Sequence, residues 1–147
     1  MRARDALGRP LPAGSPDAVP EVPERALPPA QALELARKLL AQGRAFGAHE
    51  VVEAVWKAAP AAQRDLWQGL AQVCVGLTHL QRGNRTGGAR LLRRGAGRLA
   101  AFSRTRGAGG AGSAGLTAYD AKRLAARALT LADRVDAGEK VRPELPV

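Results

Sequence analysis

A long run of mostly apolar residues from Leu66 to Leu80 is the feature that most constrains the fold of this chain. Placed on a helix, these residues leave apolar side chains on nearly every side. A helix of that kind has to be covered by neighbouring elements over most of its surface. The run therefore predicts a central, buried helix with other helices packed around it.

The composition favours helices along the rest of the chain. Of the 147 residues, 46% are hydrophobic, with Ala and Leu dominating and no isoleucine at all. Ala and Leu lose little free energy on entering a helix, whereas strands draw on Val, Ile, Thr and aromatic residues. A chain of this length has room for one domain and little more. We therefore predict a single all-α domain.

Apolar periodicity and helix-end signals divide the chain into a bundle of about five helices. Pro28 and Pro29 open one helix, and Gly43 follows its end. Pro60 begins the third helix, Asn84 is suited to cap the fourth, and Thr117 has capping-box spacing with an Asp three residues later. The predicted helices cover about residues 28–42, 44–59 (with a start at 44 or 46), 60–82, 85–103 and 117–138.

Two segments lack this periodicity. Residues 1–27 hold five of the ten prolines and mixed charges, and we expect them to form a disordered lead-in. Residues 104–116 are rich in glycine, and we expect a flexible linker. These boundaries leave a helical core domain over residues 28–103 and a C-terminal helix over residues 117–138 that packs on it.

The chain carries no sign of a membrane or secreted protein. No apolar stretch reaches the roughly 18 residues of a membrane span, and the first 20 residues lack the apolar core of a signal peptide. The single cysteine, Cys74, excludes an intrachain disulfide, and its apolar neighbours indicate a small buried side chain. We therefore expect a cytoplasmic protein that contacts no membrane, and the composition allows a homo-oligomer.

Polar residues with helical spacing occur in the second predicted helix. His49 and Glu53 are four residues apart, so they project from one face about one turn from each other. Trp56 lies beside them on that face, whereas Glu50 is rotated about 100° away. This face is therefore a candidate ligand site as well as a packing surface.

A polar stripe also follows the third predicted helix, at Gln68, Gln72 and His79. Polar side chains on a buried helix are costly unless they have partners. Because a short connection places the second and third helices antiparallel and adjacent, the simplest partner is the face that carries His49 and Glu53. The sequence therefore predicts a polar cluster between these helices, in which His49 and Glu53 contact Gln68 and Gln72.

Two interpretations of the polar cluster compete. In the first, it is a hydrogen-bonded network that fixes helix register and needs no ligand. In the second, it is a metal or small-ligand site with His49, Glu53 and His79 as ligands and Glu50 as a base. The segment resembles the His-Glu-x-x-His of metalloproteases, but Glu53 stands where the second zinc histidine should be. We favour the network, so we assign no catalytic residue and no metal ligand, and the residues specify no cofactor.

Basic residues gather in the fourth predicted helix. Eight arginines and no acidic residue lie between Arg82 and Arg106, in a chain whose net charge is +10. Four of them share one face of the helix and form a candidate anion-binding face, namely Arg90, Arg93, Arg94 and Arg98. Such a face can follow a phosphate backbone, but no aromatic residue is interleaved for base stacking. Solvation is the favoured interpretation, and binding to nucleic acid is the weaker alternative.

Three motifs occur in the order typical of one known family. They are Phe46-Gly-Ala-His-Glu-x-x-Glu-x-x-Trp56, Gln68-Gly-Leu-x-Gln72 and Gly83-Asn84-x-x-Gly87. Over about residues 33–99 this pattern resembles the domain of unknown function 309 (DUF309) family. The resemblance implies a small, all-helical bacterial or archaeal domain with no established activity. It implies nothing about residues 1–27 or the glycine-rich linker.

These observations lead us to expect a non-catalytic structural or interaction domain. The polar cluster would serve fold specificity or bind a small polar ligand. The alternative is a metal-dependent hydrolase-like enzyme that uses His49, Glu50 and Glu53. The weaker alternative is a nucleic-acid accessory protein that uses the arginine face.

Overall fold

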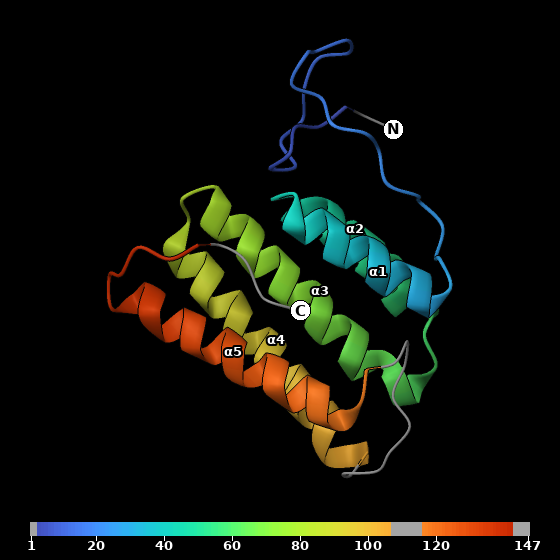
Figure 1. Cartoon of the computed structure of the whole chain (residues 1–147), viewed down its shortest axis with the longest axis vertical. Helices are drawn as coiled ribbons and strands as arrows, with labels where there is room; N and C mark the ends of the chain where they lie inside the picture. Colours follow the sequence, from blue (N-terminus) through green and yellow to red (C-terminus); the bar gives the residue numbers. More distant parts are fainter. Residues whose placement is uncertain (1–2, 107–115, 143–147) are drawn as a thin grey trace.

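The computed structural model describes residues 3–106 and 116–142 and forms an all-α bundle (Figure 1). Within those residues it contains five α-helices and no strand. The helices are α1 (Pro29–Ala41), α2 (Ala45–Ala58), α3 (Arg64–Gln81), α4 (Arg85–Arg106) and α5 (Ala118–Asp136), and a short 3-10 turn at Ala61–Gln63 precedes α3. The predicted fold class is therefore confirmed. No helix in the described part of the chain is long and apolar enough to cross a membrane.

Consecutive helices pack side by side, and α3 lies between the α1–α2 pair and the α4–α5 pair (Figure 1). Leu66, Trp67 and Leu77 of α3 are completely buried, as the apolar run predicted. Among its neighbours α3 makes its largest contact with α4, so the centre of the bundle lies between these two helices.

Glycines explain why α3 and α4 pack so closely. A Cβ atom on Gly69 would lie 3.0 Å from the carbonyl oxygen of Gly95, and one on Gly95 would lie 2.8 Å from that of Gly69. Backbone atoms at such distances leave no room for a side chain, so the two helices can approach only through glycine. Gly69 is the glycine of the Gln-Gly-Leu-x-Gln motif, and this crossing accounts for it.

The helix ends follow the signals in the sequence. Gly43 and Gly83, with φ of +73° and +84°, end α1 and α3 in the left-handed region that favours glycine. Asn84 Oδ1 accepts a hydrogen bond of 3.0 Å from the Gly87 amide, and Thr117 forms a complete capping box. In contrast, α4 continues to Arg106, so residues 104–106 of the expected linker are helical. Its residues 107–115 lie outside the described part of the chain.

The N-terminal residues, which fall within the lead-in expected over residues 1–27, carry local hydrogen bonds. Residues 3–22, which we call the N-terminal arm, form a defined segment at the end of the bundle where α2 begins and α3 ends (Figure 1). Asp5 Oδ1 closes a loop by accepting hydrogen bonds from the amides of Leu7 and Arg9, at 3.0 and 2.9 Å. The amide of Leu11 donates to the Ala3 carbonyl at 2.8 Å. Local hydrogen bonds of this kind give a segment a defined shape without any apolar periodicity.

Candidate functional site

The outward face of α2 carries the polar part of the first family motif. Val51, Val52 and Val55 are buried against the neighbouring helices. Because a helix turns about 100° per residue, the opposite side presents Phe46, His49, Glu50 and Glu53, all partly exposed. We call this side the α2 platform.

A chain of contacts fixes the ring of His49 on the platform. Its Nε2 lies 2.6 Å from Oε2 of Glu53, and the other oxygen of Glu53 lies 3.0 Å from Nζ of Lys57. On its other side the His49 ring meets the ring of Phe46, with centroids 5.5 Å apart and planes inclined by 53°. Lys57, Glu53 and His49 therefore line up behind Phe46 and restrict the orientation of its ring.

The two glutamates of the motif lie in opposite electrostatic environments. Burial opposes ionisation of Glu53, but hydrogen bonds and charge from Lys57 and His49 outweigh it and lower the pKa of Glu53. Burial dominates at Glu50 and raises its pKa, although the charges of His49 and Arg4 partly offset the effect. Glu53 is thus a paired structural anion, whereas Glu50 is a carboxylate held in a site that disfavours its charge.

The N-terminal arm covers the start of the α2 platform. Gly8 lies so close to Phe46 that a Cβ atom in its place would overlap the aromatic ring. The guanidinium carbon of Arg4 lies 5.0 Å from the centre of that ring, and the one of Arg82 lies 5.7 Å from it. Both distances fall within the range of cation–π contacts. Phe46 is therefore the surface on which the arm rests.

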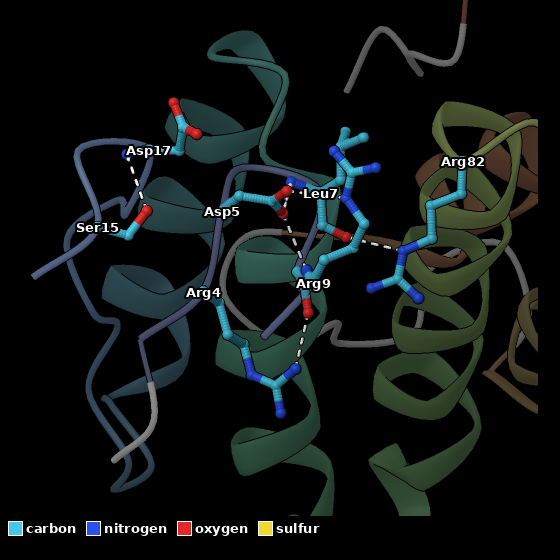
Figure 2. Close-up of polar contacts among 8 residues, drawn as sticks. Arg4, Asp5, Leu7, Arg9, Ser15, Asp17 and Arg82 are labelled. Atoms are coloured by element: carbon cyan, nitrogen blue, oxygen red, sulfur yellow. Dashed lines mark hydrogen bonds and ion pairs between the residues drawn. The ribbon is translucent and has the colours of Figure 1, made fainter. Parts of the chain in front are cut away.

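Hydrogen bonds to backbone carbonyls hold the arm in place (Figure 2). Arg82, just after α3, donates from Nε to the Leu7 carbonyl at 2.9 Å, and within the arm Arg4 donates from Nη1 to the Gly8 carbonyl at 2.7 Å. Further along, Arg44 donates from Nη2 to the Pro20 carbonyl at 2.6 Å. The bundle thus donates to main-chain carbonyls near both ends of the arm, and the side chain of Val22 is buried in the hydrophobic core.

A small cavity remains between the arm and α2. Arg4, Arg44, Phe46 and Glu50 are among the residues that line it. Nε of Arg44 is buried and has no hydrogen-bond partner. Unpartnered buried donors are commonly satisfied by bound water, and a cavity lined by guanidinium and carboxylate groups suits one.

The structure brings together only part of the predicted polar cluster. His49 and Glu53 form their pair, but no hydrogen bond joins them to Gln68 or Gln72 within the described residues. Oε1 of Gln72 and Nδ1 of His49 are both buried without a partner. Gln68 and Gln72 lie on a partly exposed side of α3, whereas Gly69 between them faces α4.

The two remaining residues of the predicted cluster, His79 and Trp56, contact other parts of the bundle. Nδ1 of His79 lies 3.0 Å from Nδ2 of Asn84, and the His79 carbonyl accepts from the Asn84 amide at 2.8 Å. His79 therefore belongs to the turn between α3 and α4. Trp56 is partly buried and packs against the hydrophobic core.

The described residues contain no complete set of ligands for the metal site that the sequence suggested as an alternative. No group of three His, Cys, Asp or Glu side chains there could hold a metal ion. His49 and Glu53 hydrogen-bond each other, and His79 contacts Asn84 instead of joining them. Cys74 is buried in the core, and burial raises the pKa of its thiol to about 12. A thiol of this kind stays protonated and is a poor nucleophile.

The predicted anion-binding face is divided by ion pairs. Arg93 of α4 contacts Asp133 and Asp136 of α5 at 2.9 and 2.6 Å, and Arg98 contacts Asp65 of α3 at 3.3 Å. Arg90 and Arg94 are exposed and have no ion-pair partner within the described residues. Two of the four arginines, Arg93 and Arg98, thus form ion pairs with neighbouring helices. Of the described residues of this face, only Arg90 and Arg94 remain available to bind an anion. Solvation remains the favoured interpretation.

Comparison with known proteins supports one relationship. The family model described as "Domain of unknown function (DUF309)" matches residues 33–91, and this match confirms the resemblance seen in the motifs. The matched span runs from α1 into α4, so it includes the α2 platform and Arg82 but neither the N-terminal arm nor α5. No curated protein and no solved structure matches the chain.

Proposed function

We propose that the DUF309 domain formed by residues 33–91 is a non-catalytic interaction domain whose α2 platform, together with Arg82, binds a polypeptide segment. The observation that carries this proposal is the seated arm. Gly8 rests on the ring of Phe46, while Arg82 donates to the neighbouring Leu7 carbonyl at 2.9 Å. The platform thus holds a segment from outside the family domain, in the manner of a bound peptide.

The kinds of contact favour a polypeptide as the bound molecule. Arg82 and Arg44 both donate to main-chain carbonyls of the arm, and every polypeptide offers such acceptors. The aromatic ring of Phe46 adds a surface for a small residue and for a guanidinium group. Main-chain hydrogen bonds that give affinity, combined with a few side-chain pockets that give specificity, are the usual means of peptide recognition.

The polar motif residues then have a supporting role. Glu53 holds His49, and the ring of His49 stands against Phe46. A binding surface needs such support, because the affinity for a segment falls when its contact groups are free to move. This role agrees with the network interpretation of the polar cluster, and no observation favours the hydrolase alternative.

The proposal is tested by removing the arm from the platform without altering the family domain. In the full chain, Gly8→Val places a side chain where the Phe46 ring lies, so the arm should leave the platform. Gly14→Val is the matched control. Gly14 has a similar φ, +78° against +81° for Gly8, but nothing lies within 4 Å of its missing Cβ. Both variants carry the same backbone strain, and only Gly8→Val has the clash.

We expect the NMR signals of Phe46, His49 and Glu50 to move in Gly8→Val and to stay in place in Gly14→Val. A synthetic peptide of residues 3–22 should then bind the Gly8→Val chain and return these signals towards their wild-type positions. The wild-type chain should resist the peptide, because its own arm is present at an effective concentration in the millimolar range. If the signals move but the peptide neither binds nor restores them, the platform is not a peptide-binding site.

A further inference from the structure

We propose that the α2 platform recognises a specific loop, Arg-Asp-x-x-Gly, and that its partner is another polypeptide presenting the same loop. In this chain the loop is Arg4-Asp5-Ala6-Leu7-Gly8. The inference rests on the proposed function, because it names the segment that the platform selects. Each of the three specified positions makes a contact that another residue type would lose.

The arginine position is specified by two simultaneous contacts. The guanidinium of Arg4 lies 5.0 Å from the centre of the Phe46 ring while its Nη1 donates to the Gly8 carbonyl at 2.7 Å. A planar guanidinium can stack on a ring and donate in its own plane at the same time, which an ammonium group does less well. Arg4 therefore closes the loop and attaches it to the platform.

The glycine position is specified by space and by backbone conformation. Gly8 is buried, its φ is +81°, and a Cβ atom would overlap the ring of Phe46. The left-handed conformation alone disfavours most residues, and the missing space excludes even alanine. This position is the most selective of the three.

The aspartate position is specified by the shape of the loop. Asp5 Oδ1 accepts from the amides of Leu7 and Arg9, Oδ2 pairs with Nε of Arg9 at 2.8 Å, and the Asp5 carbonyl accepts from the Gly8 amide at 3.0 Å. These bonds form within the arm and need no help from the bundle. The loop therefore arrives preorganised, which reduces the entropy lost on binding.

The two intervening positions are left unspecified. Leu7 meets Arg82 through its carbonyl, at 2.9 Å, and any residue supplies that group. The guanidinium groups of Arg4 and Arg82 both approach Phe46, and each finds a carbonyl oxygen of the loop as its acceptor. Two positive charges can therefore share one ring, because loop carbonyls satisfy both.

The seated arm implies competition. A partner loop has to displace the arm, which is tethered to the domain and so benefits from a high effective concentration. The partner therefore binds measurably only to a chain whose arm is displaced, or when several loops are linked together.

The inference is tested with synthetic peptides and the full Gly8→Val chain, by fluorescence anisotropy. The reference peptide has the sequence of residues 3–22. A second peptide keeps Arg4, Asp5 and Gly8 and carries serine or alanine elsewhere. Three further peptides carry Arg4→Ala, Gly8→Val or the control change Gly14→Val. We expect the second peptide and the control to bind within about threefold of the reference, and Arg4→Ala and Gly8→Val to weaken binding at least about tenfold.

The outcomes separate this inference from the proposed function. If the reference binds and the second peptide does not, the loop is not the recognition element, although the platform still binds segments. If no peptide binds, both proposals fail. Light scattering of the wild-type chain provides the last check, and we expect a monomer. A concentration-dependent dimer that disappears in Gly8→Val would show that the loop binds a second copy of this chain, which would overturn the inference of a separate partner.

Discussion

Because α3 and α4 cross so closely, we predict that two similar substitutions in α4 change the stability of the fold in opposite directions. Gly95 and Gly97 both lie inside α4, and each gains about 0.5–1 kcal/mol of helix propensity when replaced by alanine. At Gly97 nothing lies within 4 Å of the added Cβ. Gly97→Ala should therefore stabilise the fold by about that amount.

At Gly95 the added Cβ would meet atoms that cannot move aside. It would lie 2.7 Å from Cγ2 of Val73, 2.8 Å from the Gly69 carbonyl oxygen and 3.0 Å from the Val73 amide nitrogen. Two of these three atoms belong to the backbone of α3, so the helices would have to separate. Overpacking of this kind costs about 1–3 kcal/mol, and three contacts at 3.0 Å or less place Gly95→Ala near the upper end. After subtracting the propensity gain, we expect a net loss of about 2 kcal/mol.

The assay is thermal unfolding of the two full-length variants, followed by circular dichroism. For a chain of this length 1 kcal/mol shifts Tm by about 2–4 °C. Gly95→Ala should therefore lower Tm by about 4–8 °C, and Gly97→Ala should raise it by about 1–4 °C. If Gly95→Ala raised Tm as much as Gly97→Ala does, the close approach of the two helices, and with it the explanation for Gly69 in the family motif, would be refuted.

Three further predictions concern single side chains. Thr117→Ala removes the cap of α5 and should cost about 1 kcal/mol in chemical denaturation, whereas Thr130→Ala on the exposed side of the same helix should cost much less. Because the pKa of Glu53 is lowered from 4.5, its charge stabilises the fold above pH 4.5 and this stability is lost as the pH falls through the folded-state pKa; Glu53→Gln should reduce the loss of Tm on acidification. The pKa of Glu50 is raised by burial, so its contribution to stability is present below pH 4.5 and is lost as the pH rises through the folded-state pKa. Glu50→Gln should therefore raise Tm at pH 7. A lower Tm would contradict this assignment.

Much of the fold could be predicted because its causes are local in the sequence. The apolar run from Leu66 to Leu80 identified the buried helix, and glycine and capping residues identified the helix ends. The dominance of the α3–α4 contact was missed, because it depends on the alignment of glycines from two helices. The sequence showed Gly69 as part of a motif. Its structural role, which is to let α3 approach α4, becomes clear only from the position of Gly95 opposite it.

The candidate site was harder to predict because it combines residues that are distant along the chain. His49, Glu50 and Glu53 were identified from helical spacing, and the pairing of His49 with Glu53 follows from their separation by four residues. Arg4, Gly8 and Arg82 were not identified as site residues. An arginine four residues before a glycine in a proline-rich segment gives no periodic signal, and the left-handed conformation of Gly8 cannot be distinguished in the sequence from that of Gly14.

The family motifs, seen in the structure, combine two kinds of requirement. Gly69 serves the helix crossing, and the His49–Glu53 pair orients Phe46. Phe46, Gly47 and Glu50 of the first motif face the arm, and the arm lies outside the family match. A platform held by residues inside the motif, and occupied by a segment outside it, can keep its own geometry while the occupant differs from one protein to another. In this chain the first motif supplies the surface of the platform, and the segment that rests on it comes from outside the matched span.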